Sequence, residues 1–229
     1  MELSIHDVAR LLSVPEKQVR NWLRYSGLPS YSILDQYRFN RDEILEWAAT
    51  HHLPVSMERP YSGLNSETDV RLSKALHRGG IFFDLPGATM PEVFHALLDR
   101  IHLHVGADRE LLHQMLMARE AANPTGVGAG VAIPHVKNPI IVPIEKPIAA
   151  IGFLRVPIEW NAPDCKPVFC LFTLLCSSVP QHLSNLARIA NVLHHEEFQA
   201  LMRNCRDGKE ILSWLETWES RSEKAPTGP

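Results

Sequence analysis

One glycine-rich segment, TGVGAGVAIPH at residues 125–135, holds the residue types that phosphoryl chemistry requires. Its glycines, Gly126, Gly128 and Gly130, allow the backbone to approach a ligand closely and to turn N–H groups toward a phosphoryl oxygen. His135 closes a short apolar run, which would hold its ring at the edge of a sheet. A neutral imidazole near pH 7 is a competent nucleophile toward phosphorus. The segment therefore predicts a phosphohistidine site.

The elements around this segment alternate between helices and strands over residues 67–218, which predicts an α/β domain. Asp108 is expected to begin a helix that runs through Glu120. Arg119 then stands at the end of that helix, where its planar donor fork can bind the phosphoryl group. The alternative is that Arg119 only pairs with Glu120 or an exposed acid. The same helix is expected to bury four apolar side chains, Leu111, Leu112, Met115 and Leu116.

The pattern of Arg119-Glu120, four residues and then TGVGAGVAIPH resembles the signature of the type 2 Enzyme IIA (EIIA) domain of the phosphotransferase system, the fructose/mannitol/nitrogen-regulatory type. The resemblance extends over about residues 72–218 and is nearest to the nitrogen-regulatory branch. It implies a mixed β-sheet flanked by helices, with strands at residues 146–154 and 167–175. It also implies a helix from Pro180 onward that carries a second histidine, His182.

The resemblance implies the roles of the site residues as well. His135 would be phosphorylated by an HPr-type phosphocarrier protein, in an in-line transfer between two histidine nitrogens that needs no metal. His182 would donate a hydrogen bond to the phosphoryl group, and Arg119 would balance its charge. A helix-capping or surface role is the alternative for His182. The residues of the phosphoryl-binding loop would be Thr125, Gly126, Gly128 and Gly130.

Residues 1–52 form a separate small module. Two sequences that begin at Ser4 and Ser13 fit the capping-box pattern and predict two helices with a tight turn between them. A short hairpin is expected over residues 31–39 and a closing helix over residues 41–49. With IHDVARLL, the Gly27-Leu28-Pro29 turn and the following Tyr-Arg-Phe, the pattern resembles a MerR/excisionase-type winged helix-turn-helix.

The second helix of this module has an apolar side and a basic side. Val19, Trp22 and Leu23 fall together on the first, and the opposite side offers donors that match base edges and phosphates. The predicted DNA contacts, including one on the wing, are Lys17, Arg20, Asn21, Arg24 and Arg38. Residues 1–56 hold six basic and seven acidic side chains, which is unfavourable for DNA, so a protein-docking or dimerising module is the alternative.

The whole chain has 23 Lys and Arg against 26 Asp and Glu, a net charge of −3 that argues against a general nucleic-acid binder. No apolar stretch is long enough to cross a bilayer, and no secretion signal is visible. Four cysteines without a CxxC motif are typical of a cytoplasmic protein. We expect no cofactor and no metal, because the pairs His102/His104 and His194/His195 lack companion ligands.

Two segments are expected to lie outside these modules. Residues 53–66 are rich in Pro, Gly and Ser and predict a linker. Residues 219–229 predict a disordered tail. The domain organisation is therefore 1–52, linker, 67–218 and tail.

Three hypotheses for the function follow. The first is a regulatory phosphocarrier, rather than a turnover enzyme on a small molecule, whose phosphorylation at His135 changes partner binding or transcription. The second is a component that passes phosphate to a sugar-permease IIB domain. The third is a DNA-binding regulator with a non-phosphorylated EIIA-like scaffold. The complete glycine loop and His135 favour the first.

Overall fold

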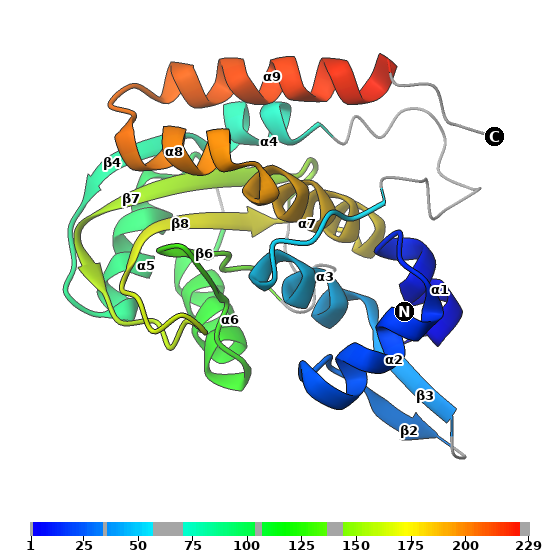
Figure 1. The fold of residues 1–229 in the computed structure, drawn as a ribbon. Helices are drawn as coiled ribbons and strands as arrows, with labels where there is room; N and C mark the ends of the chain where they lie inside the picture. Colours follow the sequence, from blue (N-terminus) through cyan, green and yellow to red (C-terminus); the bar gives the residue numbers. More distant parts are fainter. Residues whose placement is uncertain (1, 34–35, 57–70, 104–106, 137–143, 225–229) are drawn as a thin grey trace.

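The structure is a computed structural model that describes residues 2–33, 36–56, 71–103, 107–136 and 144–224. Figure 1 shows a small module at the N-terminus lying beside a larger α/β domain. Within the described residues, no helix has the length and apolar character needed to span a membrane.

The N-terminal module combines three helices with a three-stranded antiparallel sheet whose strand order is β1-β3-β2. The predicted hairpin and closing helix are confirmed. The Ser4 capping box is confirmed too, because the Ser4 hydroxyl accepts from the Asp7 amide and the Asp7 carboxylate accepts from the Ser4 amide. The elements are β1 (Glu2–Leu3), α1 (Ile5–Leu11), α2 (Glu16–Tyr25), β2 (Tyr31–Ile33), β3 (Gln36–Asn40) and α3 (Arg41–Thr50).

The second predicted capping box is wrong. Helix α2 begins at Glu16 with Pro15 as its N-cap, and no side chain caps it. Ser13 instead adopts a left-handed conformation (φ 52°), which lets the Val14 amide reach the Ala9 carbonyl and closes the turn between α1 and α2. The backbone geometry of the turn therefore takes Ser13 out of the capping position.

The larger domain is built on a five-stranded mixed sheet with the strand order β4-β7-β8-β6-β5. The central strands β7 and β8 are antiparallel, whereas β4 pairs parallel with β7 and β6 pairs parallel with β8. The predicted α/β class with helices flanking a mixed sheet is confirmed. The strands are β4 (Ile81–Leu85), β5 (Gly126–Gly128), β6 (Val131–Ala132), β7 (Ile148–Ile158) and β8 (Val168–Leu175).

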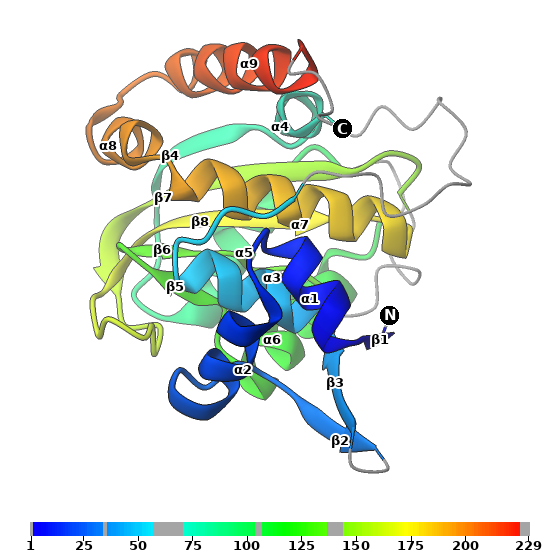
Figure 2. The same ribbon diagram turned by 45° about the vertical axis from the view of Figure 1, so that its right-hand side comes forward.

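Helices cover both faces of this sheet (Figures 1 and 2). One apolar core lies under α5 and α6, and the other lies under α4, α7, α8 and α9. This second core continues without a break into the N-terminal module, where it includes Val19, Phe39 and Ile44. The helices are α4 (Leu72–Gly79), α5 (Met90–Arg100), α6 (Arg109–Ala122), α7 (Val179–His194), α8 (Glu196–Asn204) and α9 (Gly208–Lys224).

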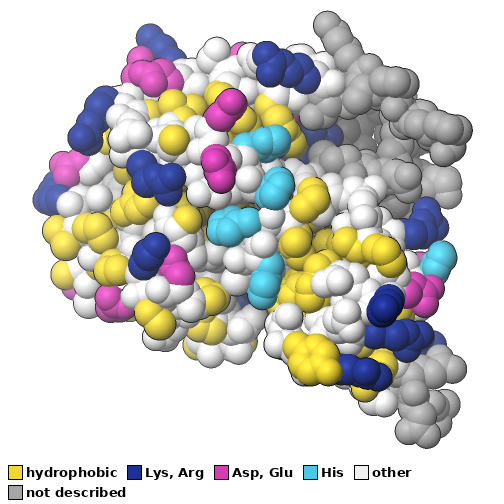
Figure 3. Space-filling model, viewed as in Figure 1, with side chains coloured by type: hydrophobic (Ala, Val, Ile, Leu, Met, Phe, Trp, Pro, Cys, Tyr) yellow, Lys and Arg dark blue, Asp and Glu magenta, His cyan; other side chains and the backbone are white. Residues whose placement is uncertain are grey.

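The two modules meet where α3 packs against α7 and β5. Next to this contact, Asn191 of α7 makes two hydrogen bonds to the backbone of Val55. Its Oδ1 accepts from the Val55 amide at 2.6 Å, and its Nδ2 donates to the Val55 carbonyl at 2.8 Å. Histidine side chains also gather along the boundary between the modules (Figure 3). The two bonds of Asn191 hold the segment after α3 against the larger domain at Val55, and the Ser56 amide donates to the Leu11 carbonyl of α1, although residues 53–66 were predicted to be a linker. Residues 57–66 lie outside the described part of the chain.

Two further predictions need correction. Leu111 was expected to be buried, but it is 43% exposed because α6 turns Leu112 and Leu116 toward the core instead. The tail was expected to be disordered from residue 219, but α9 continues to Lys224. Glu219 is buried there and accepts hydrogen bonds from the Leu72 amide and the Ser73 hydroxyl at the start of α4, which ties this part of α9 to the domain.

Candidate phosphorylation site

His135 lies just after β6, held by an isolated bridge to Leu174 of β8. Its Nδ1 atom is 2.8 Å from the carbonyl oxygen of Ile133. A carbonyl oxygen only accepts, so Nδ1 carries a hydrogen and donates it. The Nε2 atom is thereby left as the nitrogen that can react with phosphorus. The side chain is only 1% exposed.

Arg119 reaches this nitrogen from the last turn of α6. Its Nε atom lies 3.3 Å from His135 Nε2, and its Nη1 donates to the Asn123 carbonyl at 2.6 Å. The second contact fixes the guanidinium plane at the end of the helix. The structure thus places Arg119 beside His135. Of the partners that the alternative named, Arg119 does not pair with Glu120, but it does pair with another acid, Glu46.

His182 completes the predicted group from the first turns of α7. Its ring centroid is 5.1 Å from that of His135. The side chain is buried, and its Nε2 atom has no hydrogen-bond partner among the described residues. Burial first, and the neighbouring His135 second, lower the pKa of His182 to about 3. A neutral ring, with a nitrogen that has no partner among the described residues, is therefore held against His135, which argues against a surface role.

Glu46 is the site residue that the sequence analysis missed. It comes from α3 of the N-terminal module, and its Oε1 atom lies 3.0 Å from His135 Nε2 while pairing with Arg119 Nη2. Burial alone would raise the pKa of Glu46, but the contacts with His135 and then Arg119 lower it to about 2. Glu46 is therefore a carboxylate at the centre of the site. No local signal reveals this, because Arg119 is 73 positions away in the chain.

Glu120 positions the loop before His135. Its carboxylate accepts from the Thr125 amide, the Thr125 hydroxyl and the Trp160 indole N–H, each at 2.6 Å. Burial raises the pKa of Glu120, and the bonds from Thr125 oppose that rise. The predicted signature contains this residue, but its role as an anchor of the loop only becomes visible in the fold.

The glycines of the loop make a tight hairpin possible. Gly128 and Gly130 have φ values of 84° and 77°, which favour glycine. A Cβ atom on Gly130 would also lie 2.5 Å from Phe169 Cδ1. Two amides of this loop already have acceptors, because the Thr125 amide donates to Glu120 and the Ala129 amide donates to Asp164 at 2.9 Å. Binding of the phosphoryl group by Thr125, Gly126, Gly128 and Gly130 stays a prediction.

The predicted DNA contacts lie on α2 and β3 of the N-terminal module and are not among the residues that contact His135. Val19 of α2 is buried, while the basic side of the helix is exposed, as the sequence predicted. Arg20 makes an ion pair with Glu16 at 3.8 Å along the helix. Arg38 is half-buried on β3. The exposed residues of the set are Lys17, Arg20, Asn21 and Arg24.

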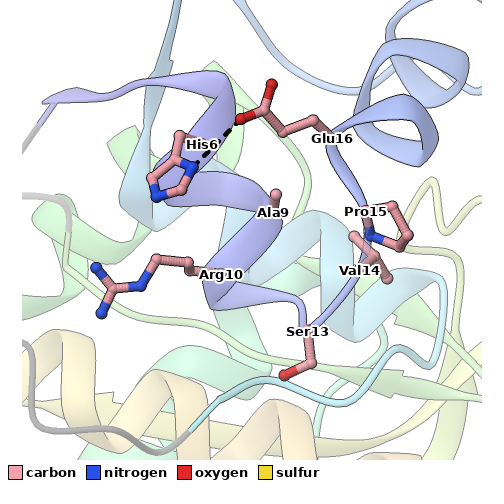
Figure 4. Close-up of a pocket in the computed structure, with 7 residues that line it drawn as sticks. All are labelled: His6, Ala9, Arg10, Ser13, Val14, Pro15 and Glu16. Atoms are coloured by element: carbon pink, nitrogen blue, oxygen red, sulfur yellow. Dashed lines mark hydrogen bonds and ion pairs between the residues drawn. The ribbon is translucent and has the colours of Figure 1, made fainter.

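Two other groups of polar side chains lie outside this site. A shallow hollow between α1 and α2 is crossed by the contact between His6 and Glu16 at 3.2 Å (Figure 4). On the far side of the sheet, His95, Glu110 and His113 have ligand atoms within 4.8 Å of one another. However, the two imidazole rings stack face to face, with centroids 3.6 Å apart, whereas a shared metal would lie in the plane of both rings. The expected absence of a metal stays a prediction.

The buried His182 makes the stability of the protein depend on pH. The unfolded chain binds a proton at His182 near pH 6.5, but the folded chain does so only near pH 3. We therefore expect the free energy of unfolding to be highest above pH 6.5 and to fall below it, by up to about 1.4 kcal/mol per pH unit for this group. Urea unfolding between pH 7.5 and 5 measures the slope.

The matched variant for this measurement is His182→Gln, whose free energy of unfolding should depend less steeply on pH. His52 and His195, whose pKa values are also lowered by burial, remain in both proteins and cancel. The charged and titratable groups around His182 are also the same in both proteins. They are Asp42, Glu46, Arg119 and His135. An identical slope in the wild type and in His182→Gln would contradict the assignment.

Comparison with known proteins identifies the families of the two modules. Residues 74–218 match the family described as "Phosphoenolpyruvate-dependent sugar phosphotransferase system, EIIA 2". The chain belongs to this family. Residues 2–52 match a helix-turn-helix domain, so the EIIA domain is preceded by a helix-turn-helix (HTH) module. Family membership supports a regulatory phosphocarrier role.

Several relatives of the EIIA domain are nitrogen regulatory proteins. One from Pseudomonas aeruginosa is 29% identical over 138 residues, covering 59% of this chain and 88% of the relative. One from Bradyrhizobium diazoefficiens is 36% identical over 112 residues, covering 48% and 71%. The crystal structure of nitrogen regulatory protein IIA-Ntr from Neisseria meningitidis superposes with a TM-score of 0.53 at 25% identity, covering 59% of this chain and 92% of that one.

Proposed function

We propose that this protein is a regulatory phosphocarrier that is phosphorylated on His135 by an HPr-type protein. The observation that carries the proposal is the meeting of three groups at one point. These are the reactive Nε2 of His135, the guanidinium of Arg119 and the unpartnered Nε2 of His182. A nucleophile, a cation and a free ring nitrogen together match what a phosphoryl group requires.

The transfer follows from this geometry. The lone pair on His135 Nε2 attacks the phosphorus of the donor's phosphohistidine, and the donor's N–P bond breaks as the new N–P bond forms. The electron pair of the broken bond stays on the donor histidine. Throughout, Nδ1–H of His135 remains bonded to the Ile133 carbonyl, which holds the ring in line. Arg119 offsets the charge on the equatorial oxygens, and a hydrogen on His182 Nε2 can be donated to one of them.

Incubation with phosphoenolpyruvate, Enzyme I and HPr tests the proposal. We expect one acid-labile phosphoryl group per chain, which mass spectrometry should place on the peptide that contains His135. The variant His135→Ala should take up none. His113→Ala, which removes a histidine from the other side of the sheet, is the matched control and should be phosphorylated normally. A wild-type protein that stays unmodified by its cognate components would contradict the proposal.

We propose further that the HTH module binds DNA through the exposed side of α2 and regulates transcription. The support is the separation of the helix into a packed side with Val19 and an exposed side with Arg20 and Arg24. The double variant Arg20→Ala/Arg24→Ala should reduce affinity for operator DNA and flatten its dependence on salt. Arg203→Ala/Arg206→Ala removes the same charge from exposed positions of the EIIA domain and is the control. Equal affinities of both double variants would rule out the α2 contact.

A further inference from the structure

The carboxylate of Glu46 lies where a phosphoryl group on His135 would lie. It contacts His135 Nε2 at 3.0 Å and pairs with Arg119. It therefore engages both the nitrogen that would carry the phosphoryl group and the guanidinium that would bind it. We propose that the docked HTH module closes the phosphorylation site in cis, with Glu46 in the phosphoryl position. Docking of the module and phosphorylation of His135 then exclude each other. This inference rests on the proposed function.

The hydrogen-bond chemistry shows why the docked site is inactive. Glu46 Oε1 can only accept, so its contact with His135 Nε2 is favourable when that nitrogen carries a hydrogen. Nδ1 already carries one, because it donates to the Ile133 carbonyl. When Nε2 carries a hydrogen as well, the ring has no lone pair for attack on phosphorus. When the ring is neutral, Nε2 instead accepts from Arg119 Nε.

The docked module also blocks access. His135 is 1% exposed and Glu46 is 12% exposed, so the histidine of a donor protein cannot come within bonding distance of Nε2. The block is held in place by α3 packed between α7 and β5. The two hydrogen bonds between Asn191 and Val55 add a second attachment away from the phosphorylation site. Movement of α3 out of this position is therefore required before transfer.

Phosphorylation in turn opposes docking. A phosphoryl group on Nε2 would place negative oxygens against the Glu46 carboxylate and would engage the Arg119 guanidinium that now holds it. Because the coupling between two states is reciprocal, a group that docking excludes must, when attached, shift the equilibrium toward the undocked state. Phosphorylation of His135 thus shifts the docking equilibrium of the HTH module through α3.

The closed site can be tested without phosphotransferase components. Diethyl pyrocarbonate acylates accessible neutral imidazoles, and mass spectrometry of the His135 peptide reports its rate. We expect Glu46→Gln and Asn191→Ala to react about tenfold or more faster than the wild type. Asn191→Ala loosens the docking without touching the site. Glu43→Gln, on the same helix, is the matched control and should react like the wild type.

The rate of phosphorylation by HPr then provides the second measurement. Both loosening variants should be phosphorylated faster than the wild type and Glu43→Gln. Hydrogen exchange in α3 should increase when the wild type is phosphorylated. Equal acylation and phosphorylation rates in all four proteins, with unchanged exchange in α3, would overturn closure and leave the phosphocarrier function intact. Faster acylation without phosphorylation of any protein would instead support closure and contradict the function proposed for the site.

Discussion

Replacing Arg119 with leucine is expected to slow the phosphorylation of His135 by about 100- to 1000-fold, the cost of removing one preorganised charge from a transfer site. The Arg119 Nε atom lies 3.3 Å from the reactive Nε2, and its Nη1 is anchored on the Asn123 carbonyl. The guanidinium therefore needs no reorganisation to meet the equatorial oxygens. Single-turnover transfer from phosphorylated HPr measures the rate, and the exposed Arg203→Leu is the control.

The variant Arg119→Leu also separates the role of Arg119 in phosphoryl transfer from its role in docking of the HTH module. Without Arg119, Glu46 loses its ion-pair partner, so the HTH module should dock less tightly and His135 should be acylated faster by diethyl pyrocarbonate. Acylation and phosphorylation are thus expected to change in opposite directions, whereas in Glu46→Gln both should rise. If Arg119→Leu is phosphorylated as fast as Arg203→Leu, the role assigned to Arg119 is wrong.

Replacing Glu120 with alanine is expected to reduce the free energy of unfolding by about 3–5 kcal/mol. The side chain is 3% exposed, and its loss leaves the Thr125 amide, the Thr125 hydroxyl and the Trp160 indole without their acceptor. The loop that leads to His135 loses its anchor at the same time, so phosphorylation should slow as well. Urea unfolding followed by circular dichroism measures the stability.

Two further variants are compared with Glu120→Ala. Glu120→Gln keeps one acceptor oxygen and should lose less stability than the alanine variant. Glu110→Ala lies on the same helix but is exposed and should change the stability by less than about 0.5 kcal/mol. A loss in Glu120→Ala no larger than that in Glu110→Ala would mean that the carboxylate does not anchor the loop.

Patterns confined to a few neighbouring residues predicted structure correctly. The capping box at Ser4 begins α1, and Asp108 caps α6 by accepting from the Leu111 amide. The hairpin before α3 was also predicted, because its turn is local. In each case the forces that select the structure act between residues that are close in sequence.

The wrong predictions have other causes. Ser13 fits a capping pattern, but the backbone turn between two packed helices places it elsewhere. The segment around Glu219 looks polar and unstructured, but its carboxylate binds the start of α4, about 146 positions away. Leu111 fits an apolar face whose orientation is decided by the packing of α6 on the sheet. Long-range contacts decided the last two, whereas the tight turn between α1 and α2 decided the first.

The sequence by itself led to the proposed phosphoryl chemistry at His135, because the glycine loop, His135 and Arg119 stand within seventeen consecutive residues and keep the spacing of a known signature. It also determined that a helix-turn-helix precedes the EIIA domain. Only the tertiary structure decided that α3 delivers Glu46 to the site beside His135, since its contact with Arg119 across 73 positions leaves no periodicity to read. The physical reason is that this carboxylate is held by the packing of α3 on α7 and β5, a property of two folded modules together.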